Sequence, residues 1–168
     1  MSDRSVTPHA ETARRPAAAP APLAWADPAR AAAFAAWLDS LQASQGLDRH
    51  SVRLACADAS FRRYFRVDAT AGSRIVMDAP PPQEDVRPFV HVAGLIGAAG
   101  LNVPQVLEAD AEHGFLLLTD LGEQLYLDAL HAASPAAAEQ LMRDALRALV
   151  QFQSKVSAET LPPFDEAL

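Results

Sequence analysis

The sequence predicts an α+β fold, in which a small antiparallel sheet is accompanied by helices. The prediction depends on the spacing of apolar residues, which changes from helical to alternating and back along the chain. Helical spacing covers residues 28–45, alternation covers residues 52–78, and helical spacing returns over residues 84–100. Two short apolar runs and a helical segment follow. We therefore expect a helix, three strands, a helix, two strands and further helices.

Length and composition are typical of one globular domain. The chain has 168 residues, 50% of them hydrophobic, and a formal net charge of −7. A nucleic-acid binder needs a basic face to displace counterions, so we expect no nucleic-acid partner. Cys56 is the only cysteine, which excludes an intramolecular disulfide, and no run is long enough for a transmembrane helix. These features favour a cytoplasmic protein with no membrane partner.

Residues 1–24 are predicted to form a disordered tail rich in alanine and proline. Pro16, Pro20 and Pro22 interrupt the segment, and alanine alone makes a weak apolar core. The alternative is an export signal, because "RRPAAAPAPLAWA" combines a twin arginine with a small-residue run.

The first helix has clear boundary signals. Asp27 can cap it, Pro28 suits its first position and Gly46 lies just past its end. A change to a period of two then indicates a meander of three strands. The residues expected to alternate on its first two strands are Val52, Leu54 and Cys56, followed by Phe61, Arg63, Phe65 and Val67. The segments "DATAGS" and "RIVM" complete it as a turn and a third strand.

Prolines 80–82 end the meander, and a helix is expected from about Glu84 to Gly100. The segments "VPQVLEAD" and "GFLLLTDL" are typical of two further strands joined by "AEHG". These strands complete a five-stranded antiparallel sheet with one helix packed against it.

The C-terminal part is predicted to be helical. A short helix is expected over Leu125–His131 and a long one from Ser134 onward. The face that the long helix is expected to bury consists of Leu141, Ala145, Leu149, Phe152 and Val156. The last residues, 165–168, look like the first turn of another helix, and we therefore expect a truncated chain.

Three arginines and three aromatic residues surround the first turn of the meander, in "CADASFRRYFRV". In an acidic chain this cluster favours a phosphate-bearing ligand, and the alternative is a solvated hairpin face. Alternation places Arg63 on the same face as Phe65, and Arg62, Tyr64 and Arg66 on the other. Only one face can point toward a ligand, so part of the cluster is expected to be solvated.

Four strings resemble the aminoglycoside phosphotransferase family, which has a protein kinase-like fold: "DASFRRYFRV", "IVMDAPP", "PFVHVAGLIGAAGLNVPQVL" and "GFLLLTDLG". Within that family they look most like the bacterial anomeric kinases for N-acetylmuramate and N-acetylglucosamine, which serve peptidoglycan recycling. The resemblance covers about residues 28–168 and depends on the order and spacing of all four strings. It implies a sugar kinase that uses ATP and Mg²⁺, with a nucleotide and a small sugar as its ligands.

The resemblance also implies a division of the chain. Residues 25–119 would form the N-terminal lobe of the kinase-like fold, preceded by the first helix. Residues 120–124 would be the hinge, and residues 125–168 the truncated start of a helical C-terminal lobe. ATP would lie in the cleft between the two lobes.

The implied nucleotide site combines the hinge with the first turn. The adenine edge would meet the Thr119 carbonyl and the Leu121 amide, with Leu118 at the back of the pocket; the alternative for "TDLG" is a plain strand end and turn. Ser60 would donate a hydrogen bond to a phosphate, and Ser60 and Leu121 would line one cleft. The implied nucleotide-binding residues are Asp58, Ala59, Ser60, Phe61, Arg62, Arg63, Val76, Asp78, Leu118, Thr119, Asp120 and Leu121.

The sequence departs from the kinase pattern in three ways. The first turn contains no glycine, and the third strand offers Met77 and Asp78 where protein kinases have a lysine. Phe89 occupies the place of the glutamate that would pair with that lysine. We consider three roles for Asp78: binding magnesium, pairing with an arginine, or capping the strand end.

None of the histidines of this chain begins the catalytic motif of the family, H-x-D-x-x-x-x-N. The chain alone is therefore predicted to be inactive, with no catalytic residue of its own. The alternative function is a non-catalytic kinase-like module that binds a nucleotide or a protein partner. The oligomeric state and the sugar specificity do not follow from the sequence.

Overall fold

The computed structural model describes residues 23–57 and 60–163. The predicted tail up to residue 22, Asp58 and Ala59 of the first turn, and the predicted last helical turn lie outside the described residues. The strands are β1 (Leu47–Ala57), β2 (Arg63–Ala69), β3 (Gly72–Asp78), β4 (Val106–Asp110) and β5 (Phe115–Thr119). The helices are α1 (Pro28–Gln45), α2 (Arg87–Ala98), α3 (Tyr126–Ala132) and α4 (Pro135–Lys155).

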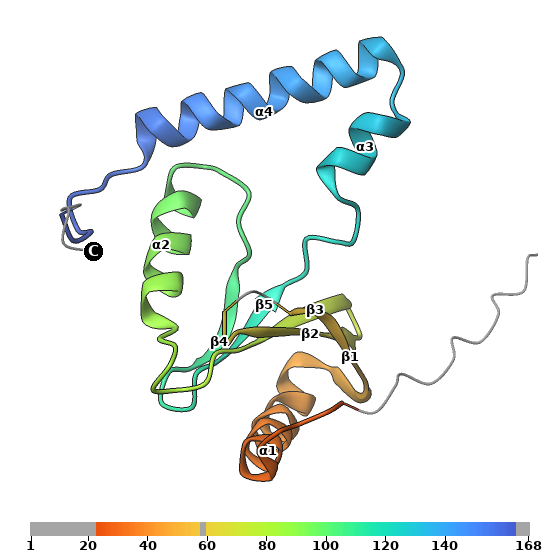
Figure 1. Cartoon of the computed structure of the whole chain (residues 1–168), viewed down its shortest axis with the longest axis vertical. Helices are drawn as coiled ribbons and strands as arrows, with labels where there is room; N and C mark the ends of the chain where they lie inside the picture. Colours follow the sequence, from red (N-terminus) through yellow and green to blue (C-terminus); the bar gives the residue numbers. More distant parts are fainter. Residues whose placement is uncertain (1–22, 58–59, 164–168) are drawn as a thin grey trace, which may run out of the picture.

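The strands form one antiparallel sheet in the order β1-β2-β3-β5-β4, which confirms the predicted α+β fold. Helix α1 covers one face of this sheet, while α2 stands beside the other face and α3 and α4 extend away from it (Figure 1). A connecting segment, residues 120–125, which we call the connector, leads from β5 to α3.

Helix α1 begins and ends where its sequence signals predict. The Asp27 carboxylate accepts a hydrogen bond from the Ala29 N–H at 2.8 Å, and Pro28 occupies the first turn. Gly46 ends the helix at φ 62°, a left-handed conformation that glycine adopts without steric cost. These signals fix the helix boundaries and set up its packing face.

The main core lies between α1 and the sheet. Phe34 and Leu38 of α1 pack against Phe65 and Val67 of β2 in one buried cluster. The Phe34 and Phe65 rings lie 5.0 Å apart at a tilted angle, and Trp25 stacks 5.6 Å from Phe65. Aromatic pairs at such distances stabilise a fold by about 1 kcal/mol beyond the contribution of the apolar area that they bury. This cluster therefore anchors α1 to the sheet.

The predicted faces of the first two strands needed correction. Val52 packs against the main core, whereas Leu54 and Cys56 are exposed on the other side. The reason is that β1 contains register shifts between Asp48 and Arg53 and again between Leu54 and Cys56, and each such irregularity breaks the alternation. Phe61 precedes β2 rather than belonging to it, so it is 65% exposed instead of sharing the buried face.

Helix α2 begins at Arg87, not at Glu84 as predicted. The Asp85 carboxylate accepts a hydrogen bond from the Arg87 N–H at 2.9 Å, and Pro88 lies in the first turn, where the missing N–H costs nothing. The end of the helix agrees with the prediction, because Gly100 follows it with φ 79°.

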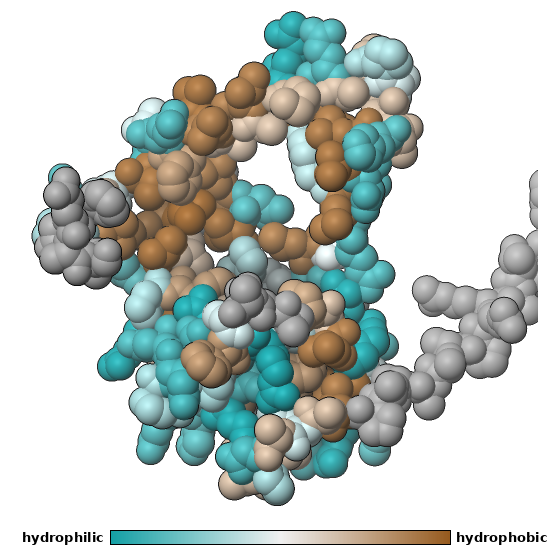
Figure 2. Space-filling view, in the orientation of Figure 1, coloured by the Kyte–Doolittle hydropathy of each residue, from teal (hydrophilic) through white to brown (hydrophobic). Residues whose placement is uncertain are grey.

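The predicted buried face of α4 is not buried in the described structure. None of the α4 residues is buried, and Leu149 and Phe152 are 50% and 42% exposed. Figure 2 shows hydrophobic residues gathered over α2 and the adjoining half of α4. The helix is amphipathic as predicted, and although α3 contacts it near Leu141, much of its apolar stripe is exposed in the described structure. Among the described helices none is long and apolar enough to cross a membrane.

Candidate functional site

A cavity of about 610 Å³ opens between the connector and the face of the sheet that is opposite α1. Its size falls in the range of small-molecule sites, which are about 300–1,000 Å³. Its described lining consists of Arg53, Leu54, Ala55, Cys56, Tyr64, Arg66, Ile75, Phe89, Pro104, Leu118, Thr119, Asp120, Leu121, Gly122, Glu123 and Leu125. Strands β1, β2, β3 and β5, helix α2 and the connector therefore all contribute to one concave surface.

The floor of the cavity is apolar. Ile75 of β3 and Leu118 of β5 are paired across the two strands. Leu118 belongs to a second core cluster, which also contains Met77, Ala79, Val86 and Leu116, and Ile75 packs against this cluster. Phe89 of α2 packs on the same cluster and closes one end. Leu54 and Leu121 are largely exposed and belong to the rim. A flat ring system fits such a slot, because its faces meet hydrocarbon while its edge meets the backbone of the connector.

Four of the predicted nucleotide-binding residues line this cavity: Leu118, Thr119, Asp120 and Leu121. The structure brings together the part of the predicted site at the end of β5 and the start of the connector. The residues predicted around the first turn and on β3 are placed differently. Ser60, Phe61, Arg62, Arg63, Val76 and Asp78 are not among the lining residues that the structure describes.

The residues of the first turn lie apart from this lining. Arg62 forms an ion pair with Glu84 at 2.8 Å, and its backbone N–H donates to the Ser60 hydroxyl at 3.2 Å. Ser60 therefore does not share the described cavity with Leu121, and its neighbours Asp58 and Ala59 lie outside the described residues. Their contact with a nucleotide stays a prediction.

Val76 points to the face opposite the cavity. It is fully buried in the main core under α1, whereas its neighbour Ile75 lines the cavity. Successive residues of a strand point to opposite faces, so only one of the two can reach a ligand on a given side. The structure places Ile75, and not Val76, in the cavity wall.

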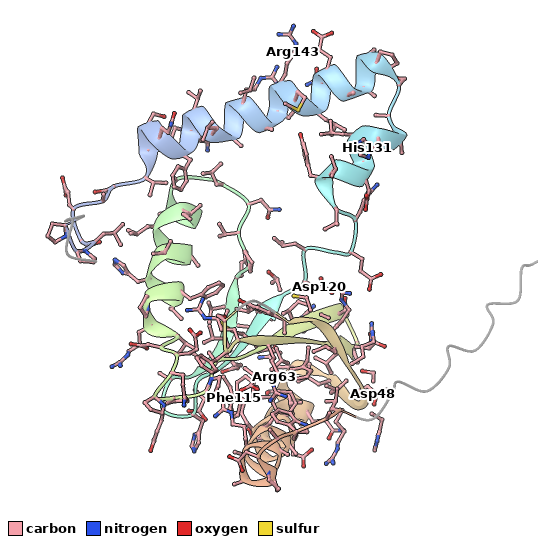
Figure 3. All side chains as sticks on the ribbon, viewed as in Figure 1. Asp48, Arg63, Phe115, Asp120, His131 and Arg143 are labelled. Atoms are coloured by element: carbon pink, nitrogen blue, oxygen red, sulfur yellow. The ribbon has the colours of Figure 1, made fainter. Side chains whose placement is uncertain are left out.

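Asp78 pairs with two arginines, which was one of the three roles considered for it. Its side chain is fully buried, and it accepts hydrogen bonds from Arg30 at 2.9 and 2.5 Å and from Arg63 at 3.1 and 2.6 Å. The Arg63 guanidinium also lies 4.0 Å over the Trp25 ring. Figure 3 shows Arg63 on the α1 side of the sheet, with Asp120 on the opposite side. This triad links α1, β2 and β3 and lies away from the cavity.

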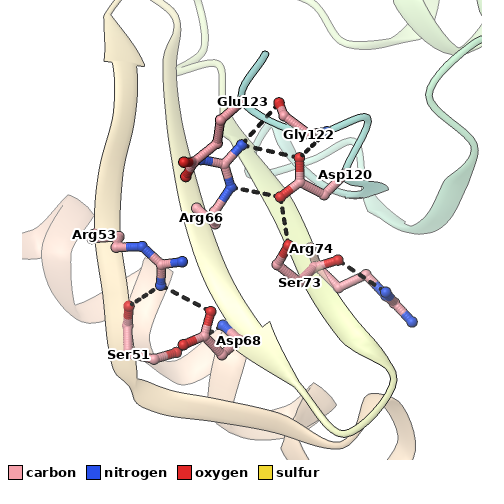
Figure 4. A network of polar contacts seen from close by, with 9 residues as sticks. All are labelled: Ser51, Arg53, Arg66, Asp68, Ser73, Arg74, Asp120, Gly122 and Glu123. Carbon is pink, nitrogen blue, oxygen red and sulfur yellow. Dashed lines mark hydrogen bonds and ion pairs between the residues drawn. The ribbon is translucent and has the colours of Figure 1, made fainter. Parts of the chain in front are cut away.

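A second polar network lies in the cavity wall, around Arg66 (Figure 4). Arg66 donates to both carboxylate oxygens of Asp120, at 2.5 and 3.0 Å, and to the Gly122 carbonyl at 3.2 Å. It also pairs with Glu123 of the connector. The hydrogen bond from Arg66, helped by one from Ser73, lowers the pKa of Asp120 far below its usual range against the opposing effect of burial. The same bond to Asp120 raises the pKa of Arg66.

Some backbone groups at the end of β5 and in the connector have hydrogen-bond partners within the described structure, and others do not. The Thr119 N–H donates to the Gln105 carbonyl at 3.0 Å, and the Thr119 hydroxyl accepts from the Gln105 N–H at 2.9 Å. Among the described residues no acceptor is found for the Leu121 N–H. An unpaired N–H beside an apolar slot is available to a ligand that presents an acceptor at its edge.

Sequence reasoning missed several lining residues, above all Tyr64, Arg66 and Ile75. A signal for the first two was present, because alternation places them on the face that the buried Phe65 does not use. The contribution of Arg53 had no such signal, since it depends on the irregular register of β1. Phe89, singled out as the departure from the kinase glutamate, does line the cavity.

The described residues contain no cluster of potential metal ligands. No group of three or more His, Cys, Asp or Glu side chains comes together in the described ranges. Among the described carboxylates, Asp78, Asp120 and Glu123 are each paired with an arginine. No step of a reaction is therefore assigned to magnesium on residues of this chain.

Together the sheet order, the helix beside it and the cavity bounded by the connector define a protein kinase-like N-terminal lobe. The model of the phosphotransferase enzyme family matches residues 51–167, which is most of the chain. The chain belongs to this family.

Curated relatives carry the name N-acetylmuramate/N-acetylglucosamine kinase. The chain is 57% identical over 114 residues to the one from Pseudomonas aeruginosa, covering 68% of this chain and 33% of the relative. It is 48% identical over 118 residues to the one from Pseudomonas putida, covering 70% and 34%. The protein from Neisseria meningitidis is 39% identical over 131 residues, covering 77% and 38%. The chain thus matches little more than a third of the length of these relatives.

Proposed function

We propose that this chain supplies the nucleotide-binding part of an ATP-dependent amino-sugar kinase. The observation that carries the proposal is the apolar slot lined by Thr119, Asp120 and Leu121, at the position where the sequence resemblance implies a hinge. In the proposal the adenine ring lies between Leu54 and Leu118. Its edge accepts a hydrogen bond from the Leu121 N–H and donates one to the Thr119 carbonyl.

The phosphates would point toward the first turn, residues 58–63. Arg62 and Arg63 already have carboxylate partners in Glu84 and Asp78. We therefore favour the Ser60 hydroxyl and the backbone N–H groups of the turn as the phosphate contacts, with Mg²⁺ arriving on the nucleotide. An arginine would join them only by exchanging its carboxylate for phosphate.

The reaction of the whole family protein would be phosphoryl transfer to N-acetylmuramate or N-acetylglucosamine, the sugars in the names of the relatives. The sequence resemblance implies the anomeric hydroxyl as the acceptor. The sugar oxygen forms a bond to the γ-phosphorus, the bond to the β,γ-bridging oxygen breaks, and ADP leaves. The sugar proton passes to a base that this chain does not supply. Because the reaction consumes ATP and serves sugar recycling, we place it in the cytoplasm.

Two measurements test this proposal on the chain as it stands. Titration with ATP, followed by tryptophan fluorescence or calorimetry, is expected to give saturable binding. An Ile75→Trp variant, which fills the slot, is expected to abolish that binding, whereas Arg49→Met, an exposed β1 variant, is the control. Absence of ATP binding to a folded wild-type chain contradicts the proposal.

The second measurement is a coupled ADP-release assay with both sugars. The chain contains no H-x-D-x-x-x-x-N motif, so we expect no turnover. Robust turnover would show that the chemistry resides in residues other than those of the family motif.

The exposed apolar face of α4 favours one second candidate, a non-catalytic module that binds a protein partner. Leu149 and Phe152 are about half exposed on a helix that has no buried residue in the described structure. Sequencing the DNA downstream of codon 168 separates the two candidates. An open frame with the catalytic motif supports the kinase, and a stop codon supports the module.

A further inference from the structure

Arg66 uses nearly all of its hydrogen-bonding capacity on the connector. Its Nε and Nη2 atoms grip the two oxygens of Asp120, Nη2 also reaches the Gly122 carbonyl, and Nη1 bonds Glu123. A guanidinium carries five N–H groups, and these contacts use four of them. Although Arg66 lines the cavity, little remains of it for a phosphate.

Asp120 is held from three sides. Besides Arg66 of β2, the Ser73 hydroxyl of β3 donates to it at 2.6 Å and the Gly122 N–H at 2.9 Å. The side chains of Arg66 and Asp120 are only 12% and 6% exposed. An ion pair shielded in this way is screened far less than a surface pair, and its planar, two-point geometry fixes orientation as well as distance.

The other arginine of the cavity wall behaves differently. Arg53 donates to the Ser51 carbonyl at 3.1 Å and pairs with Asp68 at 3.0 Å, both through Nη1, and neither partner belongs to the connector. Arg53 and Asp68 are well exposed, so their pair is worth little. The two arginines of one cavity therefore have different surroundings.

We propose that Arg66 is a positioning residue that clamps the connector to the sheet through Asp120, and that it sets the base selectivity of the cavity without touching phosphate. The part concerning bases rests on the proposed function. The Thr119 carbonyl and the Leu121 N–H flank Asp120 in the chain, so clamping Asp120 fixes the spacing of the two backbone groups that would read the purine edge. Loss of the clamp frees these groups and weakens recognition of the base.

Hydrogen exchange of the ligand-free chain tests the clamp itself. Arg66→Met is expected to speed exchange of the Gly122 amide, whose N–H donates to the Asp120 carboxylate, by about tenfold or more, because local opening no longer breaks the ion pair. Arg66→Lys keeps the charge but not the two-point geometry of the guanidinium. For this variant and for Ser73→Ala, we expect exchange rates between those of Arg66→Met and wild type. Arg49→Met is the control, since its partner Asp39 lies far from the connector and both are exposed.

Binding of three probes tests the selectivity. For Arg66→Met we expect the Kd for ATP to rise about tenfold and the preference for ATP over GTP to shrink. The Kd for inorganic tripolyphosphate is expected to stay within about twofold of wild type. This pattern separates a positioning role from general loss of folding, which would weaken the binding of ATP, GTP and tripolyphosphate alike.

Two results overturn the inference. Exchange of the Gly122 amide that is unchanged in Arg66→Met shows that Arg66 does not hold the connector. An equal loss of affinity for ATP, GTP and tripolyphosphate in a folded Arg66→Met variant shows that Arg66 contacts phosphate. If the wild-type chain binds no nucleotide, the proposed function fails, and the exchange measurement still decides whether the clamp exists.

Discussion

Replacing Asp78 with asparagine is expected to destabilise the fold strongly. The carboxylate is fully buried and accepts four hydrogen bonds, two from Arg30 and two from Arg63. Asparagine keeps one acceptor oxygen and turns an N–H₂ group toward the other arginine. Two charge-assisted bonds are lost, and one guanidinium near the core loses its partner.

The cost follows from these contacts. Breaking a buried ion pair by removing one partner costs about 3–5 kcal/mol. Arg63 is 29% exposed, so water can solvate part of its guanidinium, and the lower end of that range applies. We therefore expect Asp78→Asn to lower the free energy of unfolding by about 3 kcal/mol. This is a large part of the 5–15 kcal/mol that a domain of this size has in total.

Urea denaturation followed by circular dichroism measures this loss. The control is Asp39→Asn, which breaks an exposed pair with Arg49 and should cost less than about 1 kcal/mol. A triple variant with Arg30→Met, Asp78→Leu and Arg63→Met should recover much of the stability, because no unpaired charge remains. If Asp78→Asn is no less stable than Asp39→Asn, the triad does not hold α1, β2 and β3 together.

Three further predictions concern the connector, the cavity and α4. The folded-state pKa of Asp120 is depressed, so its contribution to stability is complete above its unfolded pKa of about 3.9 and is lost as pH falls toward the lower folded value. In urea denaturation, Asp120→Asn should therefore have a lower free energy of unfolding than wild type by a constant amount between pH 5 and 8, and the difference should shrink only below about pH 4. A difference that changes near neutral pH would contradict this. Ile75→Ala should weaken ATP binding, in free energy, by more than it lowers the free energy of unfolding. Val67→Ala, on the α1 face, should lower the free energy of unfolding by about 2 kcal/mol, because its buried side chain is lost. If each variant changed ATP titrations and urea melts equally, the two faces of the sheet would not have distinct roles. A double variant with serine in place of Leu149 and Phe152 should self-associate less in light scattering, because both native side chains expose apolar surface. An unchanged scattering profile would show that this face of α4 does not mediate self-association.

Local signals in the sequence predicted most of the fold. The cap of α1, the turn glycines and the period of two in β2 each act over a few residues, and the structure agrees with them. Alternation correctly placed Phe65 and Val67 in the core, with Tyr64 and Arg66 on the other face. It failed on β1, because register shifts are set by pairing with β2 and leave no local trace.

The site was harder to predict, because its residues meet through long-range contacts. Arg66 reaches Asp120 across 54 positions, and Arg30 reaches Asp78 across 48. No spacing rule pairs a particular arginine with a particular carboxylate at such separations. The segment after β5 lies beside the cavity, since a connector at the end of a central strand does so whichever arginine holds it, and its role as a hinge stays a prediction.

The most direct test of the nucleotide site is to locate bound ATP by NMR, from the shifts of backbone amides on titration. Our account predicts saturable shifts for residues 118–123 and 53–56, with the Leu121 amide among the largest. Saturable binding that moves other amides and leaves these unchanged would contradict it.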